Sequence, residues 1–328
     1  GCNACFSNKL VAQVADCGVP GHDEHMRILI AGSSGLIGSA VTDLLVDQHH
    51  EVVRLVRRPA LTASEIQWDP TQPLDASTWG RFDAVINLAG AGVGDHRWTP
   101  RYKQLIRDSR VLTTQHLCDA LAALPNPPSV LINASAIGWY GDTGAVPIDE
   151  TSPGGRGFLA QVCEEWEAAT TEAAQAGIRV VLLRTGLVVS SRGGAWARLI
   201  PLFRAGVGGR LGNGQQFWSA ISLHDAARAI AFCLDHPISG PVNLTCPGPQ
   251  TNAQITKTMA EVLGRSAVLP VPSAALRLIV GEFADETLGS QRVLPKRLMD
   301  AGFEFDHPTF ESALRATIDS NAMVTSGA

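Results

Sequence analysis

The stretch between residues 26 and 38 constrains this chain most. An apolar segment, residues 26–31, runs into glycines at positions 32, 35 and 38, and an amphipathic segment follows. This order fits a strand, a tight turn and a helix. Gly32 can adopt backbone angles closed to other residues, and Gly38 lets the helix pack closely on the strand. Gly35 has no side chain to keep a phosphate from the backbone, and the free N–H groups at the start of the helix attract an anion.

The turn therefore predicts a dinucleotide-binding site. The alternative, which three glycines alone leave open, is a structural turn with no ligand. The preceding strand and the following amphipathic helix favour the binding site. The residues expected around the phosphates are Gly32, Ser33, Ser34, Gly35, Leu36 and Ile37.

Two arginines follow the next strand-like segment, residues 51–56. A fold that prefers NAD places an acid there, about 20 residues past the glycine turn, to bind the ribose 2′-hydroxyl. Arg57 and Arg58 stand in its place, and guanidinium groups can pair with the 2′-phosphate of NADP(H). The sequence therefore favours NADP(H), against the alternative of two solvated arginines at a strand end.

Apolar segments alternate with helical patterns along the first half of the chain. Strands are expected at 26–31, 51–56, 66–69, 84–90, 130–135 and 178–184, and helices at 36–48, 99–124 and 158–176. Such alternation predicts an α/β fold with a doubly wound parallel sheet of the Rossmann type, covered on both faces. Ligands bind at the carboxyl ends of the strands in these sheets. The residues expected there are Asp69 near the adenine, Leu88, Ala89, Gly90, Ser135 and Arg184.

The pattern changes after residue 186. Residues 26–186 are expected to form the NADP-binding domain. Residues 187–320 are expected to form mostly a smaller C-terminal substrate-binding lobe, with segments such as 242–244 returning to the sheet. Helices are expected at 252–263, 273–280 and 310–318, residues 321–328 form a tail, and residues 1–25 are interpreted as a leader or linker of unknown role.

Cysteine usage and charge exclude several classes of protein. Cys2, Cys5 and Cys17 lie near two histidines, but their spacing fits no common zinc module, so no metal site is predicted. The odd total of seven cysteines favours reduced thiols in the cytosol over a disulfide framework. A formal net charge of −5 without long basic runs favours neither a nucleic-acid partner nor a membrane surface. No apolar run approaches the roughly 20 residues of a membrane span.

Several further motifs accompany the glycine turn. They are Asn87-Leu88-Ala89-Gly90, Ile106-Arg107-Asp108-Ser109-Arg110, Gly138-Trp139-Tyr140-Gly141-Asp142 and Phe217-Trp218-Ser219-Ala220-Ile221-Ser222-Leu223-His224-Asp225. Together they resemble the extended short-chain dehydrogenase/reductases of the nucleoside-diphosphate-sugar epimerase type. The resemblance is closest to an atypical subgroup, the epimerase family of NAD(P)-dependent oxidoreductases, and runs from about Met26 to Ile318. It implies an NAD(P) cofactor, hydride chemistry on a small sugar-like or carbonyl substrate, and often a homodimer packed through two helices.

The catalytic half of the family pattern is altered in this chain. The resemblance implies a tyrosine that passes a proton to or from the substrate oxygen, a lysine one helical turn later, and a serine or threonine that binds the same oxygen. The corresponding helix has Phe158 or Leu159 at the tyrosine position and Val162 or Cys163 at the lysine position. Neither pair can move a proton as tyrosine and lysine do.

Three residues are candidates to act on the substrate: Ser135, Tyr140 and Cys163. The phenol of Tyr140 can act as an acid if a cation such as Lys103 lowers its pKa, and the alternative is a structural aromatic residue in a loop. Ser135 can hydrogen-bond the substrate oxygen, although counting back from Tyr140 puts the usual serine position on Ala136. Cys163 is either a thiol that contacts the substrate or a buried, inert cysteine.

The sequence thus predicts an NADP(H)-binding oxidoreductase or epimerase with a small-molecule substrate. The alternative is a non-catalytic module that senses NADPH or acts as a scaffold for a partner. The missing tyrosine and lysine are the main support for this alternative.

Overall fold

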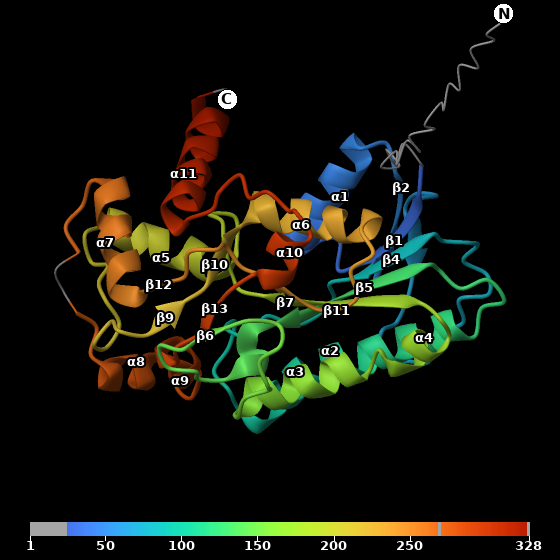
Figure 1. Ribbon diagram of the computed structural model, residues 1–328, viewed down its shortest axis with the longest axis horizontal. Helices are drawn as coiled ribbons and strands as arrows, with labels where there is room; N and C mark the ends of the chain where they lie inside the picture. Colours follow the sequence, from blue (N-terminus) through green and yellow to red (C-terminus); the bar gives the residue numbers. More distant parts are fainter. Residues whose placement is uncertain (1–24, 268–269, 327–328) are drawn as a thin grey trace, which may run out of the picture.

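A seven-stranded sheet forms the centre of the computed structural model, which describes residues 25–267 and 270–326 (Figure 1). Its strands are β1 (Arg27–Ala31), β2 (Glu51–Val56), β3 (Glu65–Gln67), β4 (Ala84–Asn87), β5 (Val130–Ala136), β7 (Arg179–Thr185) and β11 (Gly240–Leu244). They lie in the order β11-β7-β5-β4-β1-β2-β3, and all neighbours are parallel. The strand order reverses between β1 and β4, which is where such sheets bind ligands.

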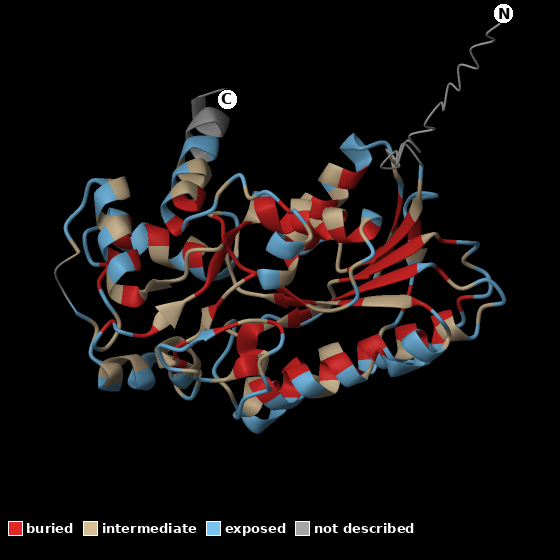
Figure 2. Cartoon of the chain, in the orientation of Figure 1, coloured by how far each residue is buried: buried red, intermediate tan, exposed pale blue. Residues whose placement is uncertain are grey.

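Helices cover both faces of this sheet (Figure 1). One face carries α1 (Leu36–Asp47) and α6 (Leu223–Asp235), and the other carries α2 (Pro100–Ala122), α3 (Phe158–Ala168) and α4 (Thr171–Gln175). Alternate side chains of β1 enter two separate cores: Ile28 and Ile30 pack toward α1 and α6, whereas Leu29 packs toward α2. Figure 2 shows the strands of the sheet buried between the two helix layers. The α/β, doubly wound fold predicted from the sequence is therefore confirmed.

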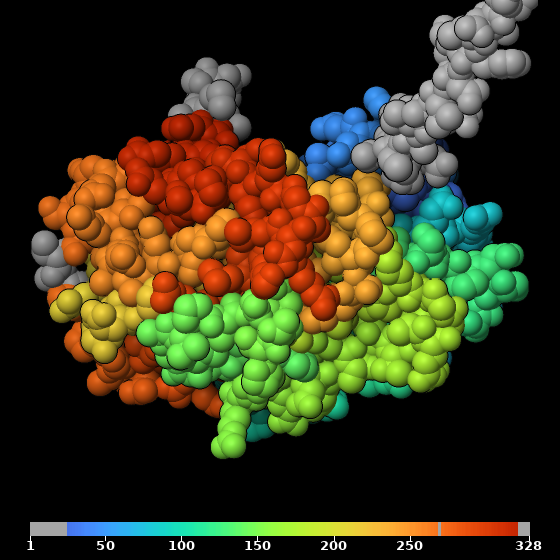
Figure 3. Space-filling model, in the orientation of Figure 1, coloured from blue at the N-terminus to red at the C-terminus, as the bar shows by residue number. Residues whose placement is uncertain are grey.

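The remaining elements build a lobe beside the sheet. Its short strands pair as β8 (Leu187–Val189) with β10 (Ala220–Ser222), β9 (Phe217–Trp218) with β12 (Gln250–Thr251), and β6 (Pro147–Ile148) with β13 (Arg292–Val293). Its helices are α5 (Gly194–Arg204), α7 (Asn252–Leu263), α8 (Ser273–Val280), α9 (Phe283–Leu288) and α11 (Phe310–Ser326). A third core, centred on Trp196 and Phe310, holds it together. The short helix α10 (Lys296–Asp300) packs against β11 of the large sheet instead. Figure 3 shows the green segment after β5 lying against the orange-red segment that contains β13.

Two expected helices differ most from the sequence prediction, and α5, α6, α9 and α10 have no counterpart in it. The helix expected at 158–176 is broken into α3 and α4, because the hydroxyls of Thr170 and Thr171 donate to the carbonyls of Glu167 (2.8 Å) and Ala168 (2.6 Å). Local side-chain bonds of this kind compete with the helical ladder. The last helix, expected at 310–318, continues to Ser326.

No helix in the described part of the chain is long and apolar enough to cross a membrane. The four cysteines within the described residues, Cys118, Cys163, Cys233 and Cys246, are free and buried. The expectations for Cys2, Cys5 and Cys17 lie outside the described residues.

Candidate nucleotide-binding and active site

A tight turn joins β1 to α1. Gly32 has a φ of +80°, and a Cβ there would lie 2.6 Å from the backbone of Leu88, just after β4. A Cβ at Gly38 would lie 2.9 Å from the Cα of Ser33 and would collide with the carbonyl oxygen of Gly32. Backbone atoms therefore exclude a side chain at both positions. Gly35 is exposed, so the N-terminus of α1 is open to solvent and fits a pyrophosphate group.

The other predicted phosphate-binding residues surround this opening. Ser33, Leu36 and Ile37 are half-buried, and Ser34 is exposed. Gly193, directly before α5, packs against Leu36, since a Cβ there would lie 3.6 Å from a Cδ of Leu36. The second lobe therefore reaches the edge of the turn.

The end of β4 lies directly beside the turn. In the predicted segment Leu88–Gly90, the first two residues are half-buried and the third is exposed. Asn87 is fully buried, and its Nδ2 donates to Oδ1 of Asn133 (2.7 Å) and Oγ1 of Thr114 (2.9 Å). These bonds connect β4 to β5 and α2, and they fix the direction in which the segment Leu88–Gly90 leaves the sheet.

Arg57 and Arg58 lie at the end of β2, and both are exposed. Arg58 donates from its two Nη atoms to both carboxylate oxygens of Glu65 in β3, at 2.8 and 2.7 Å. This pairing holds the pKa of the buried Glu65 carboxyl well below its usual range, at about 2. Arg58 is therefore fixed in place, whereas Arg57 has no charged partner among the described residues.

Asp69, expected near the adenine, lies past the end of β3 and is exposed. Its Oδ1 accepts hydrogen bonds from the backbone N–H and the hydroxyl of Thr71, at 2.9 and 2.7 Å, and these bonds lower the pKa of Asp69. The carboxylate shapes the local loop in this arrangement. Its contact with adenine stays a prediction.

Ser135 and Arg184 lie opposite each other on β5 and β7, and both are buried. The hydroxyl of Ser135 donates to Oε1 of Glu167 on α3 at 2.7 Å. Arg184 donates from Nε and Nη2 to the two oxygens of the same carboxylate, both at 2.8 Å. We expected Arg184 to contact the cofactor, and that contact stays a prediction. The structure shows its guanidinium turned toward a protein carboxylate.

Tyr140 joins this buried network. Its hydroxyl donates to Oδ1 of Asn243 on β11 (2.8 Å) and accepts from Nη1 of Arg184 (3.1 Å). Burial raises the pKa of Tyr140. The cation beside the phenol is thus Arg184 and not Lys103, whose Nζ pairs with Glu282 at 2.5 Å. The expected partnership of Tyr140 and Lys103 is not formed, because the two side chains are bound to other groups.

Cys163 is buried on the face of α3 that meets the end of β5. A Cβ at Gly138 would lie 3.7 Å from its sulfur. Burial raises the pKa of Cys163 to about 12, so almost none of the thiol is ionised at neutral pH. This environment fits the inert alternative better than a thiol that reacts with substrate.

Two polar residues of this network were not singled out from the sequence. Glu167 does not stand among the candidates from the sequence, and Asn243 falls only within the strand segment expected at 242–244. The position of Glu167 could be predicted from its spacing of four residues from Cys163, which places the two side chains on the same face of α3. Asn243 offers no such signal, because its partner Tyr140 is about a hundred residues earlier in the chain.

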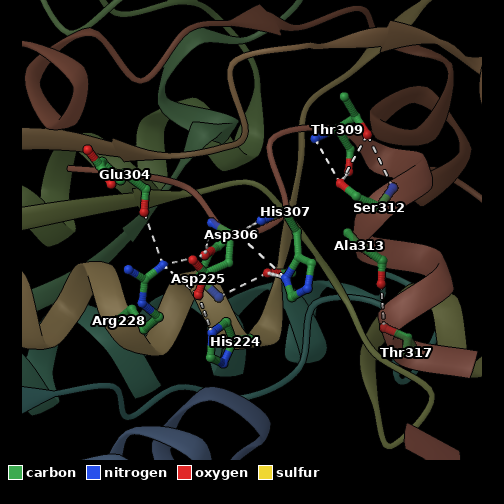
Figure 4. Close-up of polar contacts among 11 residues, drawn as sticks. His224, Asp225, Arg228, Glu304, Asp306, His307, Thr309, Ser312, Ala313 and Thr317 are labelled. Atoms are coloured by element: carbon green, nitrogen blue, oxygen red, sulfur yellow. Dashed lines mark hydrogen bonds and ion pairs between the residues drawn. The ribbon is translucent and has the colours of Figure 1, made fainter. Parts of the chain in front are cut away.

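A separate cluster of titratable residues lies at the start of α6 (Figure 4). His224 Nε2 lies 2.7 Å from Oδ2 of Asp306, and Asp225 lies beside them. Arg228 Nη1 is 3.0 Å from oxygens of both aspartates. A protein cation therefore already neutralises this cluster, which ties the 304–307 segment to α6.

The sheet, the open glycine turn at its switch point and the polar strand ends define a nucleotide-binding protein of the dehydrogenase type. The chain belongs to the NAD dependent epimerase/dehydratase family, whose model matches residues 28–245. Residues 271–317 match a second model, described as a domain of unknown function, DUF1731. The family resemblance inferred from the motifs is therefore confirmed.

Relatives match nearly the whole chain. Epimerase family protein Mb2239 of Mycobacterium bovis is 47% identical over 290 residues, which cover 88% of this chain and 96% of that protein. The crystal structure of human epimerase family protein SDR39U1 (isoform 2) with NADPH has 32% identity and a TM-score of 0.83, and the match covers 90% of this chain and 99% of the human one. A nucleoside-diphosphate sugar epimerase from Corynebacterium glutamicum has 32% identity and a TM-score of 0.74, over 92% of this chain and 62% of its own.

Proposed function

We propose that this chain binds NADP(H) across the carboxyl ends of β2, β1, β4 and β5, and exchanges hydride with a small sugar-like or carbonyl compound as an oxidoreductase or epimerase. The observation that carries the proposal is the turn from Gly32 to Gly38, where backbone atoms exclude side chains and the helix N-terminus faces solvent. The NADPH in the crystal structure of the human relative supports the choice of nucleotide.

The order of the strands orients the nucleotide. The arginines at the end of β2 suit the 2′-phosphate of the adenosine half, and the glycine turn after β1 suits the pyrophosphate. The nicotinamide half then extends over the ends of β4 and β5, near Gly90 and Ala136. When bound, the cofactor supplies or accepts the hydride, while the chain holds both halves and excludes water.

The non-catalytic alternative also has a specific observation in its favour. Ser135 and Tyr140 direct their hydroxyl protons to protein acceptors, and Cys163 is buried with a raised pKa. A catalytic role for any of the three requires the network to rearrange when substrate binds. Without such a change, the chain would bind NADPH without turnover, as a sensor or scaffold does.

A binding titration tests the nucleotide assignment. The wild-type chain should bind NADPH more tightly than NADH, and the double variant Arg57→Ala/Arg58→Ala should lose roughly tenfold or more in affinity for NADPH while NADH binding is unchanged. Arg81→Ala is the control, because Arg81 is an exposed arginine before β4. Equal affinity of the wild-type chain for the two nucleotides would contradict the assignment to NADP(H).

A deuterium-transfer assay separates the enzyme from the sensor. NADPH deuterated at the nicotinamide C4 is incubated with a panel of carbonyl compounds and sugar nucleotides, and the products are read by mass spectrometry. An oxidoreductase transfers deuterium to one class of compound. An epimerase takes hydride from its substrate onto NADP⁺ and returns it, so it is detected in a parallel incubation with NADP⁺ as a second stereoisomer of the sugar nucleotide. A sensor binds NADPH, leaves the deuterium in place across the panel, and recovers a protein partner only when NADPH is present.

We also propose a homodimer, as the family resemblance implies, and we assign its interface to α2 and α3. Leu105 and Leu112 of α2 are exposed by 49% and 38%, and a groove of about 340 Å³ runs between α2 and the α3–α4 pair. Leu105→Glu combined with Leu112→Glu should give a monomer by light scattering. Leu61→Glu, at an exposed loop position, should leave the dimer intact, and a monomeric wild-type chain would refute the proposal.

A further inference from the structure

Arg110 is a cation without an acidic partner at the end of β4. Its Nη1 donates to the carbonyl of Ile106 (2.9 Å) and its Nη2 to the carbonyl of Ala91 (2.8 Å). Its Cζ lies 5.1 Å from the centre of the Trp166 ring. Within the described ranges, no carboxylate forms an ion pair with it, unlike Arg107 one turn earlier, which pairs with Glu165 and Asp108.

The surroundings of this guanidinium make an unpaired charge costly. Burial lowers the pKa of Arg110, and a cation withdrawn from water is normally compensated by an anion or by several hydrogen bonds. A guanidinium carries five N–H donors, and the two bonds to backbone carbonyls use only part of this capacity. The residue as a whole is half-buried, and its remaining donors form no hydrogen bond with another described side chain.

Its position is at the nicotinamide half of the proposed cofactor site. A Cβ added to the exposed Gly90 would lie 3.3 Å from Cζ of Arg110, so the guanidinium lies directly against the strand end. On the facing side, α3 presents Leu159 and Cys163 toward Gly138 after β5, and neither side chain carries a charge. Arg110 therefore reaches this strand end from α2 instead of from α3.

We propose that Arg110 is the cation of the nicotinamide pocket and donates hydrogen bonds to the ribose hydroxyls of the bound nicotinamide nucleotide. It is a positioning residue that orients the nicotinamide half of NADPH, in the place where a lysine on α3 is absent. Ser109 assists from the same helix, because its Oγ accepts the backbone N–H of Ala91 at 3.0 Å. The inference rests on the proposed binding of NADP(H).

A pair of ligands tests it. NADPH covers both halves of the site, whereas adenosine 2′,5′-bisphosphate covers only the adenosine half. Arg110→Gln should weaken NADPH binding roughly tenfold and leave the affinity for adenosine 2′,5′-bisphosphate unchanged. Arg110→Lys keeps the charge and should restore most of the affinity for NADPH. Arg107→Met on the same helix is the control, and both ligands should bind it as they bind the wild-type chain.

The other outcomes are distinguishable. If Arg110→Gln loses affinity for both ligands equally and melts at a lower temperature, Arg110 only supports the Ala91 backbone. If Arg110→Gln binds NADPH as tightly as the wild-type chain does, Arg110 has no role in binding. If Arg110→Gln does not fold, the Arg110→Lys variant is used instead. The proposal is overturned if this variant binds NADPH no more tightly than it binds adenosine 2′,5′-bisphosphate. Failure of the wild-type chain to bind either ligand would instead refute the proposed function.

Discussion

The buried ion pair between Arg184 and Glu167 allows a quantitative prediction. Their side chains are 4% and 8% exposed, and two hydrogen bonds of 2.8 Å join them. Arg184→Met removes both bonds and leaves the Glu167 carboxylate buried with only the Ser135 hydroxyl as a side-chain partner. Breaking a buried pair by removing one partner costs about 3–5 kcal/mol. We therefore expect the free energy of unfolding to fall by about that amount.

The double variant separates the pair from its surroundings. When Glu167→Met is added to Arg184→Met, no uncompensated charge remains. The double variant should therefore lose about 3 kcal/mol less unfolding free energy than the sum of the two single losses. The assay is equilibrium unfolding in urea followed by tryptophan fluorescence. Trp139 is one of the seven tryptophans that contribute to this signal, and its ring centre lies 4.0 Å from Cζ of Arg184.

An exposed pair on α11 provides the control. Arg315 and Glu311 are 55% and 51% exposed and are separated by one helical turn. Arg315→Met should change the free energy of unfolding by no more than about 0.5 kcal/mol. If Arg184→Met costs no more than this control, or if the two buried substitutions are simply additive, the assignment of Glu167 and Arg184 as one structural unit is wrong.

Three further predictions concern single sites. Gly38→Ala should weaken NADPH binding at least tenfold, because its Cβ would lie 2.9 Å from backbone atoms of the turn, whereas Gly193→Ala makes only ordinary contacts and should bind normally in the same titration. Since hydrogen bonds from Arg58 and the Leu61 backbone, with the charge of Arg54, lower the pKa of Glu65 from 4.5 to about 2, the ionised carboxylate stabilises the fold above about pH 4.5. This stabilisation is lost as the pH falls toward 2. Glu65→Gln should therefore flatten the acid limb of a plot of stability against pH, and an unchanged limb would contradict the assignment. In the native protein, Cys163 should resist alkylation at pH 8 and react only after unfolding, as read by peptide mapping; labelling at the rate of a small thiol would show that it is accessible and ionised.

The position of the nucleotide site could be predicted from the sequence because its signals are local. The glycines at 32, 35 and 38 act within one turn of the chain, and the arginines at 57 and 58 follow directly on a strand. Period and length alone placed the strands of the sheet to within a few residues. Helix ends were harder, as the break at Thr170 shows, because a hydroxyl bond to the preceding turn leaves no trace in the hydrophobic pattern.

The chemistry of the strand ends could not be predicted in the same way. The sequence places Ser135 and Arg184 at strand ends and Tyr140 in the loop after a strand, but it does not show what each side chain binds. Glu167, on a helix after β5, accepts hydrogen bonds from Ser135 and Arg184, and Arg184 in turn donates to the hydroxyl of Tyr140. Arg110 stands in one of the family motifs, but the motif does not show that its guanidinium lacks an acidic partner.

By itself, the sequence determined the main strands and helices of the first half of the chain, the glycine turn and the charge at the end of β2, because these depend on residues close together along the chain. Only the tertiary structure decided which polar groups are paired and which are not. Arg184 meets Glu167 and Tyr140 inside the protein, whereas Arg110 meets only backbone carbonyls at an open strand end. That distinction depends on distances between segments far apart in sequence, and burial then sets the energetic consequence of each charge.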